Sequence, residues 1–360
     1  MKGKYIWIAL AVSAALFSAC EKEQYLAPDK SKYIYDIPQT TLPTDAIVGV
    51  YYNNYTSPVS STTSAEVPTL GYYATADEGV LAQHIAWADE AGIDFFIVTW
   101  DGSSSTTALL DRFIEARKAG GNVKFVICYN TSHLNVTNES PLEKEANYKV
   151  LLSDFVDVLA KYVTDEAYYT LDGKPVILMT PANLGSDALL SINYRQVIRS
   201  LKSDLNDFYG VVPFFIGQIT TGWVAPVNYA DHQVYSFDAV VASEWKTRAY
   251  DVFYGFFSFL DINWNNWKTT LEKRNVDFIP CVYPSYNDRI YSKNSYYYTF
   301  GNKGDEKDYV TFCNVAKRNI GSRNLVFVNS WNNWNYGTNL EPSEEKSTRF
   351  LATTKSQFKK

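Results

Sequence analysis

The chain has 360 residues, of which 46% are hydrophobic and 20% are charged, and this composition is typical of a globular protein. Its formal net charge is −6 and its Lys and Arg residues are scattered, so no basic stripe indicates a nucleic-acid partner. The length fits one large domain or two medium ones.

The N-terminal residues 1–20 have the pattern of a secretion signal. Lys2 and Lys4 give a positive start, and the apolar stretch 5–17 is too short to span a bilayer as a helix. Small residues then precede Cys20, as in the processing site of a bacterial lipoprotein. We therefore expect a signal peptide, lipidation of Cys20 and a flexible tether over residues 21–45. The alternative is an ordinary cleaved signal with an incidental cysteine.

The charges that follow Cys20 bear on location. The run Glu-Lys-Glu at 21–23 resembles the signals that send lipoproteins of the Bacteroidetes to the cell surface. We expect a secreted protein that is lipid-anchored to the outer membrane, on its periplasmic face or at the cell surface. The membrane would then be a partner only through the lipid.

Apolar runs rich in Val, Ile and Phe recur along the rest of the chain and predict β-strands. Most of them are continuous rather than alternating, as expected for parallel strands that are covered on both faces. The predicted strands are 46–52, 95–100, 123–129, 175–179, 214–219, 239–242, 278–283 and 325–328.

Helical patterns separate most of these strands. Thr75 and Glu78 have capping-box spacing before the first helix, and Ser343 is expected to cap a last helix over 343–358. Alternating strands and helices predict a (β/α)8 TIM barrel over residues 46–360, with a doubly wound open sheet as the alternative. The connection 219–239 shows little helical pattern and is the weak point of the barrel prediction.

The carboxyl ends of the strands, where a barrel holds its active site, are rich in aromatic and amide side chains and poor in charge. Aromatic rings stack on sugar faces and amides pair with hydroxyl groups, so these residues predict a site for a neutral glycan. The predicted substrate-binding residues are Tyr51, Tyr52, Trp100, Asn130, Trp245, Tyr283, Tyr286, Trp331, Asn333, Trp334 and Tyr336.

Segment 330–342, SWNNWNYGTNLEP, resembles the strand-end signature of glycoside hydrolase family 99, roughly S-W-N-E-W-x-E-G-T-x-[IL]-E-P. The stretches VGVYY at 48–52, AGIDFFIVTW at 91–100 with His84 before it, and YPSYND at 283–288 are similar to other parts of that family in the same order. The resemblance implies a (β/α)8 barrel that acts on glycans, with endo-α-mannosidases among the members.

The chain departs from that signature at two positions. The resemblance implies a Glu at position 333 that helps the sugar's own 2-hydroxyl attack, and a Glu at position 336 that acts as general acid and base. Asn333 cannot take up a proton near neutral pH, and a tyrosine with a pKa of about 10 is a poor acid or base there. Loss of one positioned acid or base typically costs roughly 10²–10⁴ in rate. We therefore predict a degenerate or repurposed glycosidase that recognises glycans.

The alternative is an active, endo-acting glycoside hydrolase that uses other carboxylates. Glycosidases need two carboxyl groups about 5–5.5 Å apart for retention or about 6.5–9.5 Å apart for inversion. Glu244 with Asp101 or Asp288 is the candidate catalytic set, because these residues follow predicted strands. No cofactor is expected, and the three His residues lack metal-ligand spacing, so no metal site is expected. A structural or protein-binding lipoprotein is a third possibility.

Overall fold

Parallel strands and outer helices alternate along the chain in the computed structural model, which describes residues 32–134, 136–137, 139–180, 194–219, 225, 234–244, 255–295, 297–301 and 304–360. Residues Asp36–Lys360 form one compact unit that contains every strand named here. The strands pair in parallel in the order β8-β7-β6-β5-β3-β2-β1-β10-β9. Their bounds are β1 Ile47–Tyr52, β2 Phe95–Trp100, β3 Lys124–Asn130, β5 Lys174–Thr180, β6 Phe214–Ile219, β7 Ala239–Ala242, β8 Asp277–Ile279, β9 Cys281–Val282 and β10 Leu325–Val328.

The circle of strands closes through one strand that is interrupted at Pro280. β8 pairs with β7, β9 pairs with β10, and Pro280 alone separates β8 from β9. Proline has no backbone N–H to donate, but its carbonyl accepts a hydrogen bond from Phe327 N at 2.9 Å. With β8 and β9 counted as one strand, the described residues form eight parallel strands at the eight predicted places. The predicted (β/α)8 barrel is confirmed, and the open doubly wound sheet is wrong.

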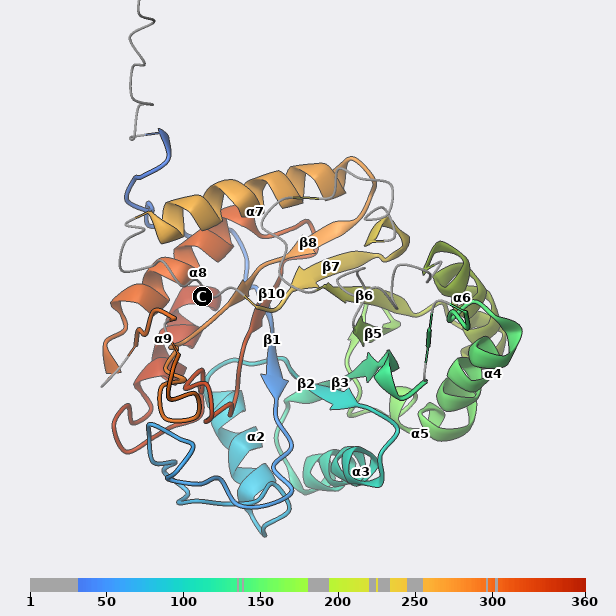
Figure 1. The fold of residues 1–360 in the computed structure, drawn as a ribbon, viewed down its shortest axis with the longest axis horizontal. Helices are drawn as coiled ribbons and strands as arrows, with labels where there is room; N and C mark the ends of the chain where they lie inside the picture. Colours follow the sequence, from blue (N-terminus) through green and yellow to red (C-terminus); the bar gives the residue numbers. More distant parts are fainter. Residues whose placement is uncertain are drawn as a thin grey trace, which may run out of the picture. The chain divides into compact units, whose positions relative to one another are not determined.

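Helices lie around the outside of the strands (Figure 1). Their apolar faces pack on the barrel, as the buried positions of each helix indicate. Within the described ranges, no helix combines the length and the apolar character that a membrane span needs. The α-helices are α2 Val80–Glu90, α3 Ser104–Ala119, α4 Glu145–Ser153, α5 Ala160–Val163, α6 Tyr194–Tyr209, α7 Phe256–Glu272, α8 Lys307–Asn319 and α9 Arg349–Phe358, and the π-helix η3 (Asp154–Val158) joins α4 to the segment before α5.

Two predicted helix starts are wrong. The hydroxyl of Thr75 accepts a hydrogen bond from Tyr55 N at 2.8 Å, so it is used within a loop, and α2 begins only after Gly79, whose φ is 77°. Ser343 Oγ accepts from Lys346 N at 3.0 Å in a turn, and Ser347 has a φ of 55° that no helix allows. The last helix therefore starts at Arg349. The connection 219–239 lies mostly outside the described residues.

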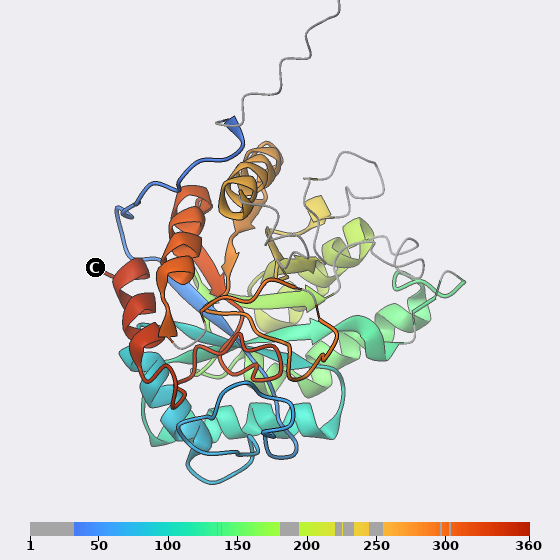
Figure 2. The same ribbon diagram turned by 60° about the vertical axis from the view of Figure 1, so that its left-hand side comes forward.

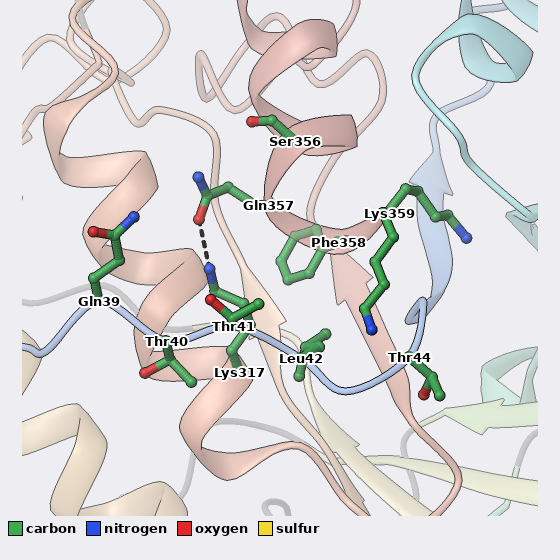
Figure 3. Close-up of a pocket in the computed structure, with 11 residues that line it drawn as sticks. Gln39, Thr40, Thr41, Leu42, Thr44, Lys317, Ser356, Gln357, Phe358 and Lys359 are labelled. Carbon is green, nitrogen blue, oxygen red and sulfur yellow. Dashed lines mark hydrogen bonds between the residues drawn. The ribbon is translucent and has the colours of Figure 1, made fainter.

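The segment before β1 packs against the last two helices. Thr40 N donates to Asn314 Oδ1 of α8 at 2.9 Å, and the side chain of Leu42 is buried. A cavity of about 110 Å³ lies between this segment, α8 and α9, where Lys317 Nζ donates to Gln357 Oε1 at 2.7 Å (Figure 3). The packing of the barrel unit therefore begins upstream of its first strand.

Gly49 in β1 makes room for two aromatic rings. It lies in register with Phe95 of β2 on one side and Phe327 of β10 on the other. The two phenyl rings meet edge to face across it, with centroids 5.9 Å apart and planes at 86°. A Cβ at position 49 would lie 2.4 Å from Phe95 Cε2 and 3.0 Å from Phe327 Cδ1, so any larger residue must displace a buried ring.

We expect Gly49→Ala to lower the free energy of unfolding by about 1–3 kcal/mol, because extra volume in a packed core forces strain. The urea midpoint of unfolding measures this change. Val150→Ala is the control, since Val150 is 51% exposed on α4 and its loss should change stability by at most about 0.5 kcal/mol. Equal midpoints for Gly49→Ala and the parent protein would contradict this account of the core.

Candidate functional site

Residues 330–342 after β10 form a closed loop, which we call the motif loop. Ser330 N donates to Thr338 O and Leu340 N donates to Ser330 O, both at 2.9 Å. The hydroxyl groups of Ser330 and Thr338 are 3.0 Å apart. These bonds bring the two ends of the loop together, so Asn333 and Tyr336 lie in its middle, at the carboxyl end of the barrel.

A buried carboxylate anchors the motif loop from behind. Glu341 is fully buried, and its Oε2 accepts from Tyr73 Oη at 2.5 Å and from Trp334 Nε1 at 3.2 Å. Its Oε1 lies 3.0 Å from His84 Nε2, and His84 Nδ1 lies 2.9 Å from Tyr52 Oη. These five residues, the Glu341 cluster, connect the motif loop to β1, to α2 and to the loop that carries Tyr73.

A buried ion pair holds the other side of the motif loop. Lys346 Nζ lies 2.8 Å from Glu66 Oε1 and donates to Ser285 Oγ at 2.6 Å. Ser285 Oγ in turn donates to the carbonyl of Gly337 at 2.6 Å, and Asn339 Nδ2 donates to Glu66 Oε2 at 3.2 Å. Burial lowers the pKa of Lys346, and the charge of Glu66 opposes that shift. Both clusters are therefore structural supports for the loop.

Gly337 lets the motif loop lie directly on the turn after β9. Its φ of 59° is in the left-handed region, and a Cβ there would be 2.9 Å from the carbonyl oxygen of Asn287. Asn287 N donates to the carbonyl of Tyr336 at 2.8 Å. Figure 2 shows the two segments, drawn in orange and red, running beside each other. A side chain at position 337 would push them apart.

The side chains at the two departures from the family signature are half-buried. Asn333 Oδ1 accepts from Tyr336 N at 3.2 Å, and Asn333 N donates to Ser330 Oγ at 2.8 Å. The ring of Tyr336 stacks on Tyr286, with centroids 6.4 Å apart and planes at 13°, and meets the edge of Tyr291 at 5.6 Å. An amide and a phenol thus stand where the signature has carboxylates.

The stack of tyrosines continues into the barrel. Tyr283 lies parallel to Tyr286 at 6.3 Å, and its hydroxyl donates to the carbonyl of Ser243 at 2.9 Å. Tyr286 Oη donates to Asp288 Oδ2 at 3.0 Å. Burial first, and then the charge of Asp288, raise the pKa of Tyr286 well above its ordinary value. The Tyr286 hydroxyl therefore stays protonated and acts as a hydrogen-bond donor.

Six of the aromatic residues predicted to contact a glycan have buried side chains: Tyr52, Trp100, Tyr283, Tyr286, Trp331 and Trp334. Tyr52 and Trp334 belong to the Glu341 cluster, and Trp331 packs edge to face on Phe96 at 5.2 Å. The indole of Trp100 is 2% exposed and donates to a threonine of α3. These rings are almost completely buried. A position at a strand end therefore does not determine whether a side chain turns toward solvent or packs into the fold.

Other predicted binding residues line the barrel end or lie outside the described residues. Asn130 is half-buried, and its Oδ1 accepts from Ser132 N at 3.0 Å. The hydroxyl of Tyr51 is buried inside the barrel, and burial raises its pKa well above the ordinary value. Trp245, and Cys20 as the predicted lipidation site, lie outside the part of the chain that the structure describes.

The three candidate catalytic carboxylates have different surroundings. For Asp101, burial would raise the pKa, but the hydrogen bonds from Ser103 and Thr106 outweigh it and the pKa is lowered. Asp288 is 2% exposed and accepts from the Tyr286 hydroxyl, whereas Glu244 is exposed just beyond β7. These hydrogen bonds favour the ionised form of Asp101, which suits a base or an acceptor.

Sequence reasoning missed a cluster of three polar side chains after β3. Asp154 Oδ2 accepts from Tyr129 Oη at 2.6 Å and lies 3.0 Å from His133 Nε2. His133 Nδ1 is 2.7 Å from the carbonyl of Asn130. Only the place of His133, four residues beyond a predicted strand, could have indicated it, because Asp154 is brought in by a separate helix. Across the described ranges, no three His, Cys, Asp or Glu side chains are placed to hold a metal ion.

We expect Glu341→Gln to lower the free energy of unfolding by about 1–3 kcal/mol, because an amide cannot accept from all the donors that face the carboxylate. Urea unfolding measures the loss. Glu344→Gln is the control, because Glu344 is exposed near the same loop and its change should be within about 0.5 kcal/mol. A parent-like midpoint for Glu341→Gln would show that the cluster does not anchor the loop.

Known proteins share this barrel. The chain is 24% identical over 322 residues to the "Glycoprotein endo-alpha-1,2-mannosidase" of Mus musculus, a match that covers 81% of this chain and 60% of the mouse protein. The chain thus spans less than two thirds of that relative. A solved structure named "Glycoside hydrolase-like protein" is 25% identical, with a TM-score of 0.77, and the match covers 92% of this chain and 99% of that one.

A GH99 endo-alpha-mannosidase from Bacteroides thetaiotaomicron, solved with bis-tris-propane, has the same fold. It has a TM-score of 0.61 and 20% identity over 87% of this chain and 97% of its own. The protein-family model "Glycosyltransferase WbsX" matches residues 60–354, which is most of the barrel. The resemblance to glycoside hydrolase family 99 is thereby confirmed, and the chain belongs to the Glycosyltransferase WbsX family of barrels like those of that hydrolase family.

Proposed function

We propose that this protein binds glycans at the carboxyl end of its barrel and lacks the glycosidase chemistry that its resemblance implies. The observation that carries the proposal is the middle of the motif loop. Asn333 Oδ1 is occupied by the N–H of Tyr336, and the Tyr336 ring stacks on Tyr286. An amide and a stacked phenol do not exchange protons with a glycosidic oxygen near neutral pH.

Glycan is the ligand class that relatives and surface chemistry support together. The mouse relative is named as an endo-α-1,2-mannosidase, and the solved neighbours are glycoside hydrolases or like them. Tyr291 is 49% exposed beside half-buried Tyr336, so aromatic surface is available for a sugar face. Half-buried Asn130 and Asn333 add amides that suit hydroxyl groups.

The position of Glu244 supports a second candidate function, that of an active endo-acting hydrolase. It is exposed just after β7, and the carbonyl of the preceding Ser243 accepts from Tyr283 Oη at 2.9 Å and from Asn329 Nδ2 at 2.8 Å. A carboxylate on a fixed backbone at a strand end is well placed for catalysis. Asp101, with its lowered pKa, would be the ionised partner.

The full-length protein, purified in detergent, should bind at least one oligosaccharide on a glycan array that includes α-1,2-linked mannosides. Tyr336→Ala should weaken that binding roughly 3–10-fold, the loss expected for an aromatic contact. Tyr72→Ala is the matched control, because Tyr72 is a 41%-exposed tyrosine outside the motif loop. A protein that binds no glycan on the array refutes the proposal.

The same preparation should release no reducing sugar from the oligosaccharides it binds. Turnover that disappears in Glu244→Gln would establish the second candidate instead. Because the family carries a glycosyltransferase description, nucleotide-activated mannose and glucose belong in the assay as donors. Transfer of sugar from either donor would contradict both the proposal of glycan binding without turnover and the second candidate, the active hydrolase.

We also propose that Cys20 carries the lipid that holds the protein in the outer membrane. The support is the positive start, the short apolar stretch and the small residues before Cys20. Cells grown with labelled palmitate should label the protein, and Cys20→Ser should abolish the label and release the protein from the membrane fraction. Labelling that survives in Cys20→Ser would overturn this assignment.

A further inference from the structure

The loop after β9 borders an open hollow that the motif loop does not line. Its volume is about 400 Å³, within the usual range for small-molecule sites. Asp288 and Lys293 contribute opposite charges, and the rest of the lining is polar or aromatic. The lining residues are Asp288, Ser292, Lys293, Asn294, Ser295 and Tyr297.

Asp288 has one carboxylate oxygen that nothing in the described structure satisfies. The residue is 2% exposed, and Oδ2 accepts from Tyr286 Oη at 3.0 Å. Oδ1 is buried and has no hydrogen-bond partner. A buried carboxylate oxygen without a donor is costly, so it calls for a ligand or a structural explanation. The backbone around it is fixed, since the Asp288 carbonyl accepts from Ser292 N at 2.7 Å.

Aromatic rings border the hollow and continue to the motif loop. Tyr297 meets the edge of Tyr286 at 6.1 Å, and Tyr286 stacks on Tyr336. Tyr291, which precedes the lining residue Ser292, is 49% exposed and meets the edge of Tyr336 at 5.6 Å. An exposed ring beside a carboxylate acceptor is a combination that suits a sugar residue, whose apolar face stacks while its hydroxyl groups donate.

We propose that this hollow, the loop subsite, binds one neutral sugar residue of the glycan. A sugar hydroxyl donates to Asp288 Oδ1, and the ring of Tyr291 packs on the sugar. The sugar is neutral because the charges of Asp288 and Lys293 cancel within the lining. Asp288 is then a binding residue and not one of the pair that would cleave the bond. The inference rests on the proposed glycan-binding function and names a subsite for it.

The test is a titration of the full-length protein with probes of defined structure. α-1,2-Linked mannobiose and the methyl glycosides of mannose, glucose and galactose are the neutral probes, and methyl glucuronide is the anionic one. At least one neutral probe should bind, as seen by saturation transfer from the protein to the sugar protons. Asp288→Asn should weaken it by about tenfold or more, because an acceptor for a charge-assisted bond is replaced by an amide donor.

Tyr291→Ala should weaken the same probe roughly 3–10-fold, while Tyr72→Ala should leave its affinity unchanged. Tyr291 is about half exposed, so this variant tests the subsite even if Asp288→Asn does not fold, and melting curves show which variants fold. Parent-like affinity in Tyr291→Ala, or in folded Asp288→Asn, overturns the subsite. So does binding of the glucuronide alone, or loss of turnover without loss of affinity in Asp288→Asn.

Failure of the subsite and failure of the proposed function give different results. If the protein binds glycans on the array but Tyr291→Ala and Asp288→Asn bind them as well as the parent does, only the loop subsite is wrong. If the parent binds neither an array glycan nor a soluble probe, the proposed function is wrong and the subsite fails with it.

Discussion

The buried carboxylate of Glu341 is the constraint on which the barrel end depends. A charged group that is removed from water must be surrounded by donors, and those donors must stay in place. Tyr73 and Trp334 supply two of them, and His84 faces the other oxygen. Since these partners come from a loop, the motif loop and α2, the position of one side chain sets the relative places of three segments.

Lys346 and Glu66 act in the same way on the opposite side of the motif loop. Their ion pair reaches the loop through Ser285 and Asn339 rather than through Asn333 or Tyr336 in its middle. The shape of the loop is therefore maintained by buried groups outside its middle. Neither support involves the side chain of Asn333 or Tyr336, so the barrel holds this loop with an amide and a phenol at those two positions.

The strands could be predicted because parallel barrel strands are covered on both faces and therefore read as continuous apolar runs. The burial of Trp331 and Trp334 could not be predicted, since it depends on partners such as His84 that are distant in sequence. Thr75 has capping-box spacing but is used by the backbone of Tyr55. The cluster of Asp154 and His133 could not be predicted either, because Asp154 belongs to a later helix and only the fold brings it to the end of β3.

Gly337 is required by the architecture of the motif loop. Its backbone conformation and its contact with Asn287 exclude every side chain, whatever chemistry its neighbours perform. Gly337, Thr338 and Glu341 of the signature thus serve the architecture of the motif loop. A match to this signature therefore identifies the architecture of the loop, and it does not by itself identify a chemical activity.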